Sequence, residues 1–437
     1  MKKKMLLSAV GVSLLLSSAV AEPVTLRFMF WGSVFEKQAI EAMARKFEAE
    51  NPGIKIQTEH VPNDYATKMN TLIAAGREPD IAYMGFNNAL PLAEKGKLLD
   101  LTGYAKQNPD LGQRIPELMG YFAPGKTIGS STAGESIQIF YNKQLFKDAG
   151  VAAPPITAAT AWTWDQFVDT AKKLTLDRSG KNASQAGFDP KNIKQYGVSF
   201  GTWWAIWLPL LASNGAAITD ASGTKYAMNS PEAVKVFQKM QDLMYKDHVA
   251  PTPTQIATFP ITAQQLQTRR VAMVIDGQWS LLDMASSKVN FGMGVLPKFK
   301  TPKTAILGAG TVIFASTKHK AEALKFYLFH NDPNKVDLFK QGLWMPLQKK
   351  YYTNAVLIDS WSKNAVHPVE FKTAVIDYVM GNAIKQPDAS IRNYDKIDPI
   401  ITAGLDTMWQ GKQSAKQALD ALAPKVQPLL KGLWPSK

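Results

Sequence analysis

The first part of the chain switches between two hydrophobic periodicities. Bulky apolar residues recur at every second position over residues 26–31 and 54–57, and the segment 80–84 is a short apolar run after its first residue, Asp80, as in β-strands. Between them, residues 35–47 and 65–73 repeat apolar side chains at helical spacing. Strands separated by helices of this length predict a parallel sheet with right-handed crossovers, and so an α/β fold.

The same patterns continue towards the end of the chain. We expect further strands at residues 136–141, 271–275, 291–296 and 311–314. We expect further helices at residues 142–149, 203–212, 231–246, 320–329 and 414–431. Two helix starts carry clear signals, because Thr163 and Gln166 can form a capping box and Ser230 precedes a proline at the first helical position.

One edge of the first predicted sheet collects aromatic and polar residues. Ligands of open α/β sheets bind beyond the carboxyl ends of the strands. Residues 31–33, 63–65 and 85–88 all fall at that edge. The first of these segments, Trp31-Gly32-Ser33, offers a large flat indole face with no catalytic group beside it. The start of the chain therefore predicts a ligand site with an aromatic wall.

The N-terminus has the three parts of a secretory signal peptide. Lysines at positions 2–4 precede an apolar run at residues 5–16, and residues 19–21 form a small-residue cleavage site. We expect the mature chain to begin at Glu22. No later window is apolar for long enough to span a bilayer, and a chain without cysteine has no lipid-anchor site and no disulfide. This combination predicts a soluble, periplasmic protein.

The composition is that of an ordinary globular protein with an excess of basic residues. Loss of the three signal-peptide lysines lowers the formal net charge from +14 to +11. Such a charge suits loose attraction to anionic membrane surface or an acidic ligand. No run of more than two Lys or Arg follows the signal peptide, so nucleic acid is not an expected partner.

Motifs of the common catalytic chemistries are absent from the sequence. It has no G-x-S-x-G, H-E-x-x-H or Walker A motif, and its five histidines are scattered. We therefore expect no catalytic residue, no metal and no cofactor. The enzyme alternative is a secreted glycoside hydrolase, for which Asp64, Glu135 and Asp276 could supply the carboxylate pair. A purely structural protein, the third possibility, would bind no small molecule.

Short motifs follow one another in a fixed order over the mature chain. They are FEAENPGIKI at residues 47–56, PDI at 79–81, YNK at 141–143, TW at 163–164, VAM at 271–273, GQW at 277–279, GVLP at 294–297, GAG at 308–310, and the segments 321–329 and 342–346. In this order they resemble the extracellular solute-binding proteins (family 1) of ABC importers, the maltose-binding-like group. The sequence departs at Thr268-Arg269-Arg270, where a glycine-lysine often stands in that family.

The resemblance implies a two-lobed α/β protein of the periplasmic-binding-protein type II fold. Each lobe would be an open mixed sheet flanked by helices, with a hinge between the lobes and crossings near residues 130–134, 297–301 and 331–335. We accordingly expect five segments, which are a cleaved signal peptide at 1–21, a first lobe built from 22–132 and 300–332, and a second lobe built from 133–299 and 333–437.

The resemblance also implies that the ligand lies in the cleft between the lobes. An indole face packs against the C–H face of a sugar ring, and the ring hydroxyls need hydrogen-bond partners at the rim. The expected ligand-binding residues are aromatic, polar or small and lie near predicted element ends; they are Trp31, Ser33, Asp64, Asn87, Ser131, Glu135, Trp203, Trp204, Asp276, Gly277, Trp279, Gly308, Gly310 and Trp344.

The function implied is that of the substrate-binding component of an ABC importer. Such a protein is a monomer that binds a mono- or oligosaccharide and delivers it to inner-membrane permease subunits coupled to a cytoplasmic ATPase. Glycerol 3-phosphate, a glycerophosphodiester or an acidic oligosaccharide is an alternative ligand, because the chain is basic and residues 130–132 are rich in hydroxyl groups.

Overall fold

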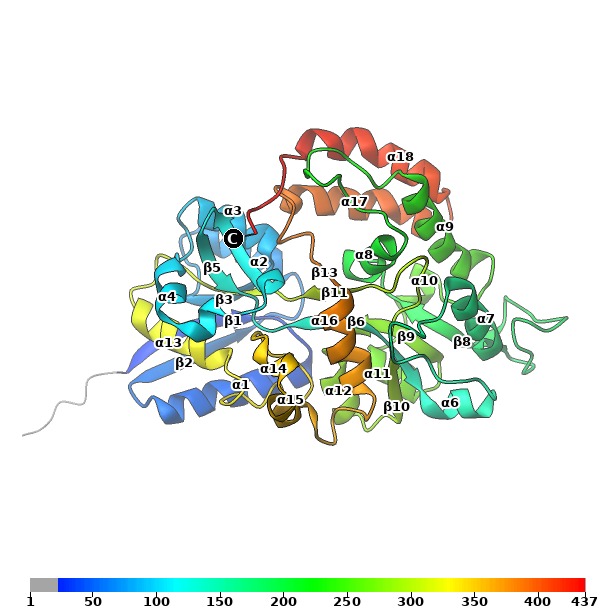
Figure 1. Cartoon of the computed structure of the whole chain (residues 1–437), viewed down its shortest axis with the longest axis horizontal. Helices are drawn as coiled ribbons and strands as arrows, with labels where there is room; N and C mark the ends of the chain where they lie inside the picture. The colour runs from blue at the N-terminus through cyan, green and yellow to red at the C-terminus, as the bar shows by residue number, and fades with distance from the viewer. Residues whose placement is uncertain (1–22, 437) are drawn as a thin grey trace, which may run out of the picture.

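The computed structural model describes residues 23–436 and arranges them in two lobes that lie side by side, each built around its own sheet (Figure 1). The expected signal peptide falls outside the described residues. Within the described part, no helix is both long enough and apolar enough to cross a membrane. The two-lobed α/β architecture expected from the sequence is confirmed.

The smaller sheet forms the first lobe and has the strand order β12-β3-β1-β2. Its strands are β1 (Val24–Phe30), β2 (Ile54–His60), β3 (Ile81–Met84) and β12 (Gly310–Ile313). β1 runs parallel to β2 and β3, as predicted, whereas β12 is antiparallel to β3. Both faces of β1 are buried near its end, because Phe28 and Phe30 lie in one hydrophobic cluster and Met29 lies in another. Phe28 packs edge-on against Phe326.

Helices cover this sheet and a hairpin extends the lobe. The helices are α1 (Val34–Glu50), α2 (Tyr65–Ala74), α3 (Phe86–Glu94), α4 (Thr102–Gln107), α5 (Pro109–Gly112) and α13 (Lys320–His330). A 3₁₀ turn (Pro116–Leu118) leads into the hairpin of β4 (Met119–Ala123) and β5 (Lys126–Ser130). α1 begins with a capping box, in which Ser33 and Glu36 satisfy each other's backbone N–H groups.

The larger sheet forms the second lobe, with strand order β13-β11-β6-β9-β8-β7 and β10 paired to the far end of β6. The strands are β6 (Glu135–Asn142), β7 (Leu176–Asp177), β8 (Ile193–Phe200), β9 (Val271–Gly277), β10 (Phe291–Gly294), β11 (Thr304–Leu307) and β13 (Ala383–Lys385). The sheet is mixed, since β8 is parallel to β9 while β6 is antiparallel to β9 and to β11.

Most of the remaining helices pack around this larger sheet. They are α6 (Lys143–Asp148), α7 (Trp164–Leu174), α8 (Trp204–Ser213), α9 (Pro231–Tyr245), α10 (Pro253–Ile256), α11 (Thr262–Gln267), α12 (Ser280–Ser286), α14 (Lys350–Thr353), α15 (Ala355–Ser362), a π-helical turn (Lys372–Asp377) with α16 (Tyr378–Asn382), α17 (Tyr394–Trp409), and α18 (Ala415–Val426) with a 3₁₀ turn (Gln427–Leu429). The Thr163 capping box and the Ser230 cap are both present. Figure 1 shows α17 and α18 together at the top of the second lobe.

The chain passes between the sheets at places that differ in part from the sequence-based division. β11 pairs with β6 in the larger sheet, so the chain returns to the smaller sheet at Gly308 and Ala309 and not at residue 300. The C-terminal tail also returns to the first lobe, because Trp434 lies in a hydrophobic cluster with Met29 and Leu90. The short strand β11 and the tail are placed by tertiary pairing, which local patterning does not encode.

Candidate functional site

A cavity of about 440 Å³ lies between the two lobes, where strand ends of both sheets meet. Its lining combines indole rings, carboxyl groups, amides and glycine backbone from distant parts of the chain: Trp31, Glu36, Gly85, Asn87, Glu135, Trp203, Trp204, Trp279, Leu307, Gly308, Ala309, Gln386 and Asp388. The arrangement follows from the topology, because open α/β sheets bind ligands at strand ends.

The wall from the first lobe is Trp31, the residue after β1. Its ring stands edge-on to Tyr65, with 4.8 Å between ring centroids, and to Tyr83, at 5.4 Å. The Tyr65 hydroxyl donates to the carbonyl oxygens of Met29 and Tyr83, which fixes the ring that supports the indole. Trp31 is therefore a half-buried, rigidly supported aromatic face.

The wall from the second lobe consists of three indoles. Trp203 and Trp204 stand before and at the start of α8, and their ring centroids are 5.4 Å apart. Trp279 stands before α12, 6.1 Å from Trp203. Trp203 keeps 40% of its surface exposed, an unusual state for a large aromatic side chain. Both members of the Trp203–Trp204 pair line the cavity, so neither is turned away from it.

Gly277 sets the position of the Trp279 ring. A Cβ atom at residue 277 would lie 2.0 Å from two carbons of that ring. The indole therefore lies flat on the backbone at the end of β9, an approach that only glycine permits.

Three carboxyl groups line the same cavity, and the pKa of each is raised. Burial raises the pKa of Glu36 to about 7, with a smaller contribution from Asp283. Burial and the charge of Glu36 raise the pKa of Glu135 to about 8. Burial raises the pKa of Asp388 to about 7, and Asp398 adds to the shift. Desolvation penalises the charged carboxylate, which is why all three shifts have the same sign.

The ionisable side chains that line the cavity are all acidic. Among the described residues that line it, none is Lys, Arg or His. The Oδ1 atom of Asp388 is buried and has no hydrogen-bond partner within residues 23–436. Groups of His, Asp and Glu placed to hold a metal ion do not occur in that range. The site can thus accept hydrogen bonds or positive charge and offers aromatic faces, but it offers no cationic side chain to an anion.

The crossing peptide at Gly308 is held tightly beside the cavity. Its N–H donates to Oε1 of Gln386 at 2.9 Å, and its carbonyl accepts from Nε2 of Gln386 at 3.0 Å. The Ser131 hydroxyl donates to the same carbonyl at 3.1 Å. A Cβ at residue 308 would lie 2.3 Å from the carbonyl oxygen of Ala133, so this position also requires glycine.

Seven of the residues expected from the sequence lie outside the cavity lining, and four of them are polar. Ser33 caps α1 and donates to Oδ1 of Asp283 in α12 at 3.0 Å, a contact between the lobes. Asp64 is exposed at the start of α2. Ser131 is fully buried at the crossing. The carboxylate of Asp276 accepts from two hydroxyl groups and its neighbouring backbone N–H, so it is committed within the second lobe.

The other three are apolar or glycine. Gly277 lies behind Trp279, and Gly310 is buried in β12. Trp344 is only 3% exposed and packs against His330 and Phe339, with ring centroids 4.8 and 5.6 Å away. It belongs to the core, not to the cavity lining.

Four lining residues carried no prediction, and they are Glu36, Leu307, Gln386 and Asp388. Gly85 and Ala309 also line the cavity, and they fall inside the expected edge segment 85–88 and the GAG segment 308–310. Glu36 had a usable signal, because an S-x-x-E capping pattern directly after Trp31 places a carboxyl group at the same strand end. Gln386 and Asp388 follow the three-residue strand β13 and had no local signal.

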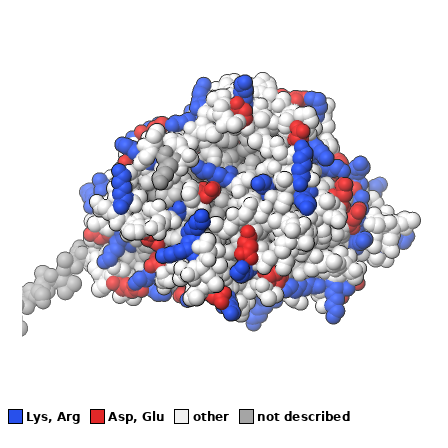
Figure 2. All heavy atoms as spheres, viewed as in Figure 1, with Lys and Arg blue, Asp and Glu red and all other residues white. Residues whose placement is uncertain are grey.

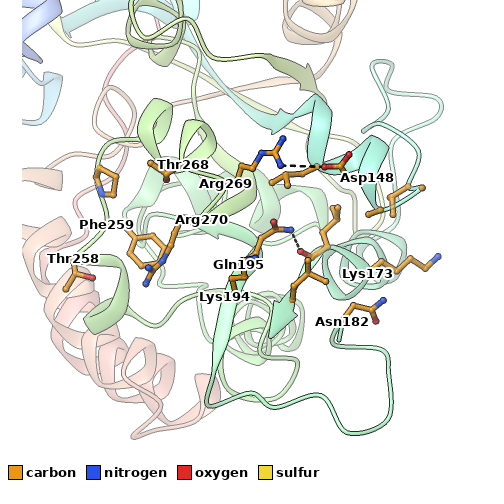
Figure 3. Close-up of a pocket in the computed structure, with 17 residues that line it drawn as sticks. Asp148, Lys173, Asn182, Lys194, Gln195, Thr258, Phe259, Thr268, Arg269 and Arg270 are labelled. Carbon is orange, nitrogen blue, oxygen red and sulfur yellow. Dashed lines mark hydrogen bonds and ion pairs between the residues drawn. The ribbon is translucent and has the colours of Figure 1, made fainter. Parts of the chain in front are cut away.

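A second, larger hollow of about 1150 Å³ lies at the opposite ends of β8 and β9, within the second lobe (Figure 3). Arg269 there lies 3.7 Å from Asp148, and the Arg270 guanidinium lies 4.7 Å above the Phe259 ring. Basic side chains are also spread over both lobes on the face shown in Figure 2, with acidic groups among them. The hollow is lined by one lobe and by no tryptophan, so the inter-lobe cavity is the stronger candidate site.

Comparisons with known proteins agree with this architecture. A binding protein of Brucella abortus (strain 2308) is 26% identical over 450 residues, covering 98% of each chain. The sn-glycerol-3-phosphate-binding periplasmic protein of Escherichia coli O6:K15:H31 (strain 536) is 24% identical, covering 97% of this chain and 96% of the relative.

Solved structures show the same fold. The ABC substrate-binding protein of Listeria monocytogenes in complex with cycloalternan has a TM-score of 0.77 and 22% identity, with 93% of this chain and 99% of the other covered. A solute-binding protein of Thermotoga lettingae bound with α-D-tagatose has a TM-score of 0.76 and 22% identity, with 93% and 100% covered. The family of bacterial extracellular solute-binding proteins matches residues 32–329. The chain belongs to the family of bacterial extracellular solute-binding proteins.

Proposed function

We propose that this protein is the periplasmic substrate-binding component of an ABC importer, and that it binds a mono- or oligosaccharide between its lobes. The observation that carries the proposal is the cavity itself, in which Trp31 of one lobe and Trp203, Trp204 and Trp279 of the other surround hydrogen-bonding groups. Its volume of about 440 Å³ is within the range of small-molecule sites. Indole faces suit the C–H faces of sugar rings, and the carboxyl and amide groups suit their hydroxyls.

The comparisons favour the same class of ligand. The Thermotoga lettingae protein was solved with a sugar, α-D-tagatose. The Escherichia coli relative is named for sn-glycerol 3-phosphate, which keeps a phosphorylated polyol as the second candidate. Phosphate sites use Arg, Lys or helix N-termini. The cavity lining includes the N-terminal ends of α3, α8 and α12, but it has no basic side chain and it has three carboxyl groups that would repel a phosphate. We therefore prefer a ligand without negative charge.

The protein acts by binding alone in this proposal, without catalysis. The carboxylates that a glycoside hydrolase was expected to use are not assembled, since Asp64 lies on the surface and Asp276 is hydrogen-bonded inside the second lobe. Delivery to permease subunits in the inner membrane is the role of this family's importers, and the expected signal peptide would place the protein in the periplasm.

A ligand screen tests the proposal. The mature chain is incubated with tagatose, maltose, maltotriose and glycerol 3-phosphate, at low and high salt, and the unfolding temperature and tryptophan fluorescence are recorded. Sugar binding that raises the unfolding temperature and resists salt supports the proposal, because uncharged ligands respond little to ionic strength. Salt-sensitive binding of glycerol 3-phosphate alone would contradict it.

Two controls sharpen this screen. Trp203→Ala should abolish most of the response to the bound sugar, whereas Tyr104→Ala, a similarly exposed aromatic on α4, should not. Chromatography of the recovered sugar tests for catalysis. Hydrolysis products would indicate a glycoside hydrolase and would contradict the proposal.

A further inference from the structure

We propose that the natural ligand of the inter-lobe cavity carries a positively charged nitrogen, as an amino sugar does, and that Glu36, Glu135 and Asp388 bind this charge between the indole walls. The inference rests on the proposed function and narrows the ligand class within it. It selects, among carbohydrates of the same size, those with a basic amine over neutral and anionic ones.

The first argument is the set of charges that the cavity holds. Buried carboxylates in proteins are normally paired with a cation or with several donors. Burial and the charge of Glu36, with no hydrogen bond among the causes, raise the pKa of Glu135. The buried Oδ1 of Asp388 has no hydrogen-bond partner among the described residues. A neutral sugar can donate hydrogen bonds to these atoms, but only a cation also compensates their charge.

The surroundings of the carboxyl groups add little positive charge. Asp283 and Tyr83 lie near Glu36, and Asp398 lies near Asp388. The base near Asp388 is Lys385, which does not line the cavity. Burial lowers the pKa of Lys385, so its charge is itself disfavoured. No cationic side chain of the lining therefore compensates these carboxyl groups, and the positive partial charge beside Asp388 comes from the backbone N–H groups of Phe86 and Ala389.

The aromatic walls favour the same ligand. The face of an indole attracts a cation through its quadrupole, and tryptophan does so more strongly than tyrosine or phenylalanine. Trp203 and Trp279 are inclined at 50° with ring centroids 6.1 Å apart, so they present faces in two directions. Trp31 adds a face from the other lobe. A sugar ring with a protonated amine can use both properties of these rings, apolar packing and attraction of the cation.

The proposal has a consequence for pH dependence. Glu36 and Asp388 have pKa values of about 7 and Glu135 of about 8 without ligand. A bound cation stabilises the carboxylate form and lowers these values. Cation binding should therefore release protons to the buffer and strengthen as pH rises from 5.5 to 7.0, while a sugar amine with a pKa of about 7.7 stays mostly protonated.

Calorimetric titration of the mature chain separates the possibilities. The probes are glucosamine oligomers of one to four units and their N-acetylated counterparts, which keep the ring count and lack the charge. At pH 7.0 the amine series should bind roughly 10-fold more tightly or better, as expected of a charge-assisted contact. Its heat should depend on the ionisation heat of the buffer, and its advantage should shrink at pH 5.5.

Equal or tighter binding of the N-acetylated series, or of maltotriose, at pH 7.0 would overturn the inference and leave the proposed function standing. Failure of every carbohydrate to bind would remove both.

Matched variants locate the effect. Glu135→Gln and Asp388→Asn keep the shape of the side chain, and each should reduce amine binding about 10-fold while changing N-acetyl binding less than about 3-fold. Glu36 is not substituted, because its carboxylate also caps α1. Asp406→Asn, on the exposed face of α17, serves as the control and should change neither. An amine preference that survives in both acidic variants, confirmed as folded by thermal unfolding, contradicts the assignment.

Discussion

Gly277→Ala should displace Trp279, although it adds one methyl group outside the cavity lining. The added Cβ would lie 2.0 Å from two ring carbons and 2.2 Å from a third, whereas ordinary contacts begin at 3.4 Å. The six-membered ring must therefore retreat by about 1.4 Å, or the end of β9 must shift. The residue does not have a positive φ, so the effect is steric and not conformational. Overpacking of this kind costs about 1–3 kcal/mol of unfolding free energy.

Urea unfolding of four proteins measures this effect. They are the wild type, Gly277→Ala, Trp279→Ala and the double variant. In the Trp279→Ala background the alanine at 277 meets no ring, so its cost should fall to a few tenths of a kcal/mol, and the coupling energy should be about 1–2 kcal/mol. Trp279→Ala should also weaken ligand binding by about 1–3 kcal/mol, the scale of one buried large side chain. If Gly277→Ala costs the same with and without the indole, the reasoning is wrong.

Further predictions follow from burial and titration. Because Glu135 has a pKa raised from 4.5 to about 8, its contribution to stability is complete below pH 4.5 and is lost as pH rises through 8, so Glu135→Gln should flatten that part of a stability–pH profile measured by urea unfolding. Trp344→Ala should cost about 3–5 kcal/mol in unfolding free energy but leave the ligand affinity of the folded protein nearly unchanged. Trp203→Ala should weaken ligand binding but leave the unfolding free energy nearly unchanged. Arg114→Met should cost about 1–3 kcal/mol in thermal or urea unfolding, because the buried guanidinium donates to Ser130, Tyr327 and Asn331 near the crossings.

The elements that the sequence predicted well are those whose signals are local. α7 begins at the predicted place because Thr163 forms a capping box there, and α1 includes the predicted residues 35–47. α17 was missed, and its sequence explains why, since Pro399 lies inside it and argues against a continuous helix. β11 and β13 were also missed, although the similarly short β3, β10 and β12 were predicted, because their positions depend on the pairing edges that β6 and β11 provide.

The candidate site was predictable in part, for a similar reason. A tryptophan directly after a strand, such as Trp31, must lie near the ligand edge of a parallel sheet. The sequence pattern does not predict the direction of a side chain within a turn. Asp276 and Trp344 were expected to face the cavity, but Asp276 accepts a hydrogen bond from Ser280 and Trp344 packs against His330. Asp388 reaches the cavity from a loop whose position depends on the whole fold.

The position of the cavity connects ligand binding to the movement of the lobes. Glu135, Gly308 and Gln386 all line it, and all lie where the chain passes between the sheets. A ligand changes the balance between open and closed forms only through its different affinity for them. Trp31 follows β1 of the smaller sheet and Trp279 follows β9 of the larger sheet, so both can contact one ligand only when the lobes are close together. Ligand contacts on both walls are therefore lost on opening, whereas the Gln386–Gly308 contact belongs to the crossing itself. We therefore expect the two walls to drive closure of the lobes, and the crossing, held by the Gln386–Gly308 hydrogen bonds, to serve as the hinge.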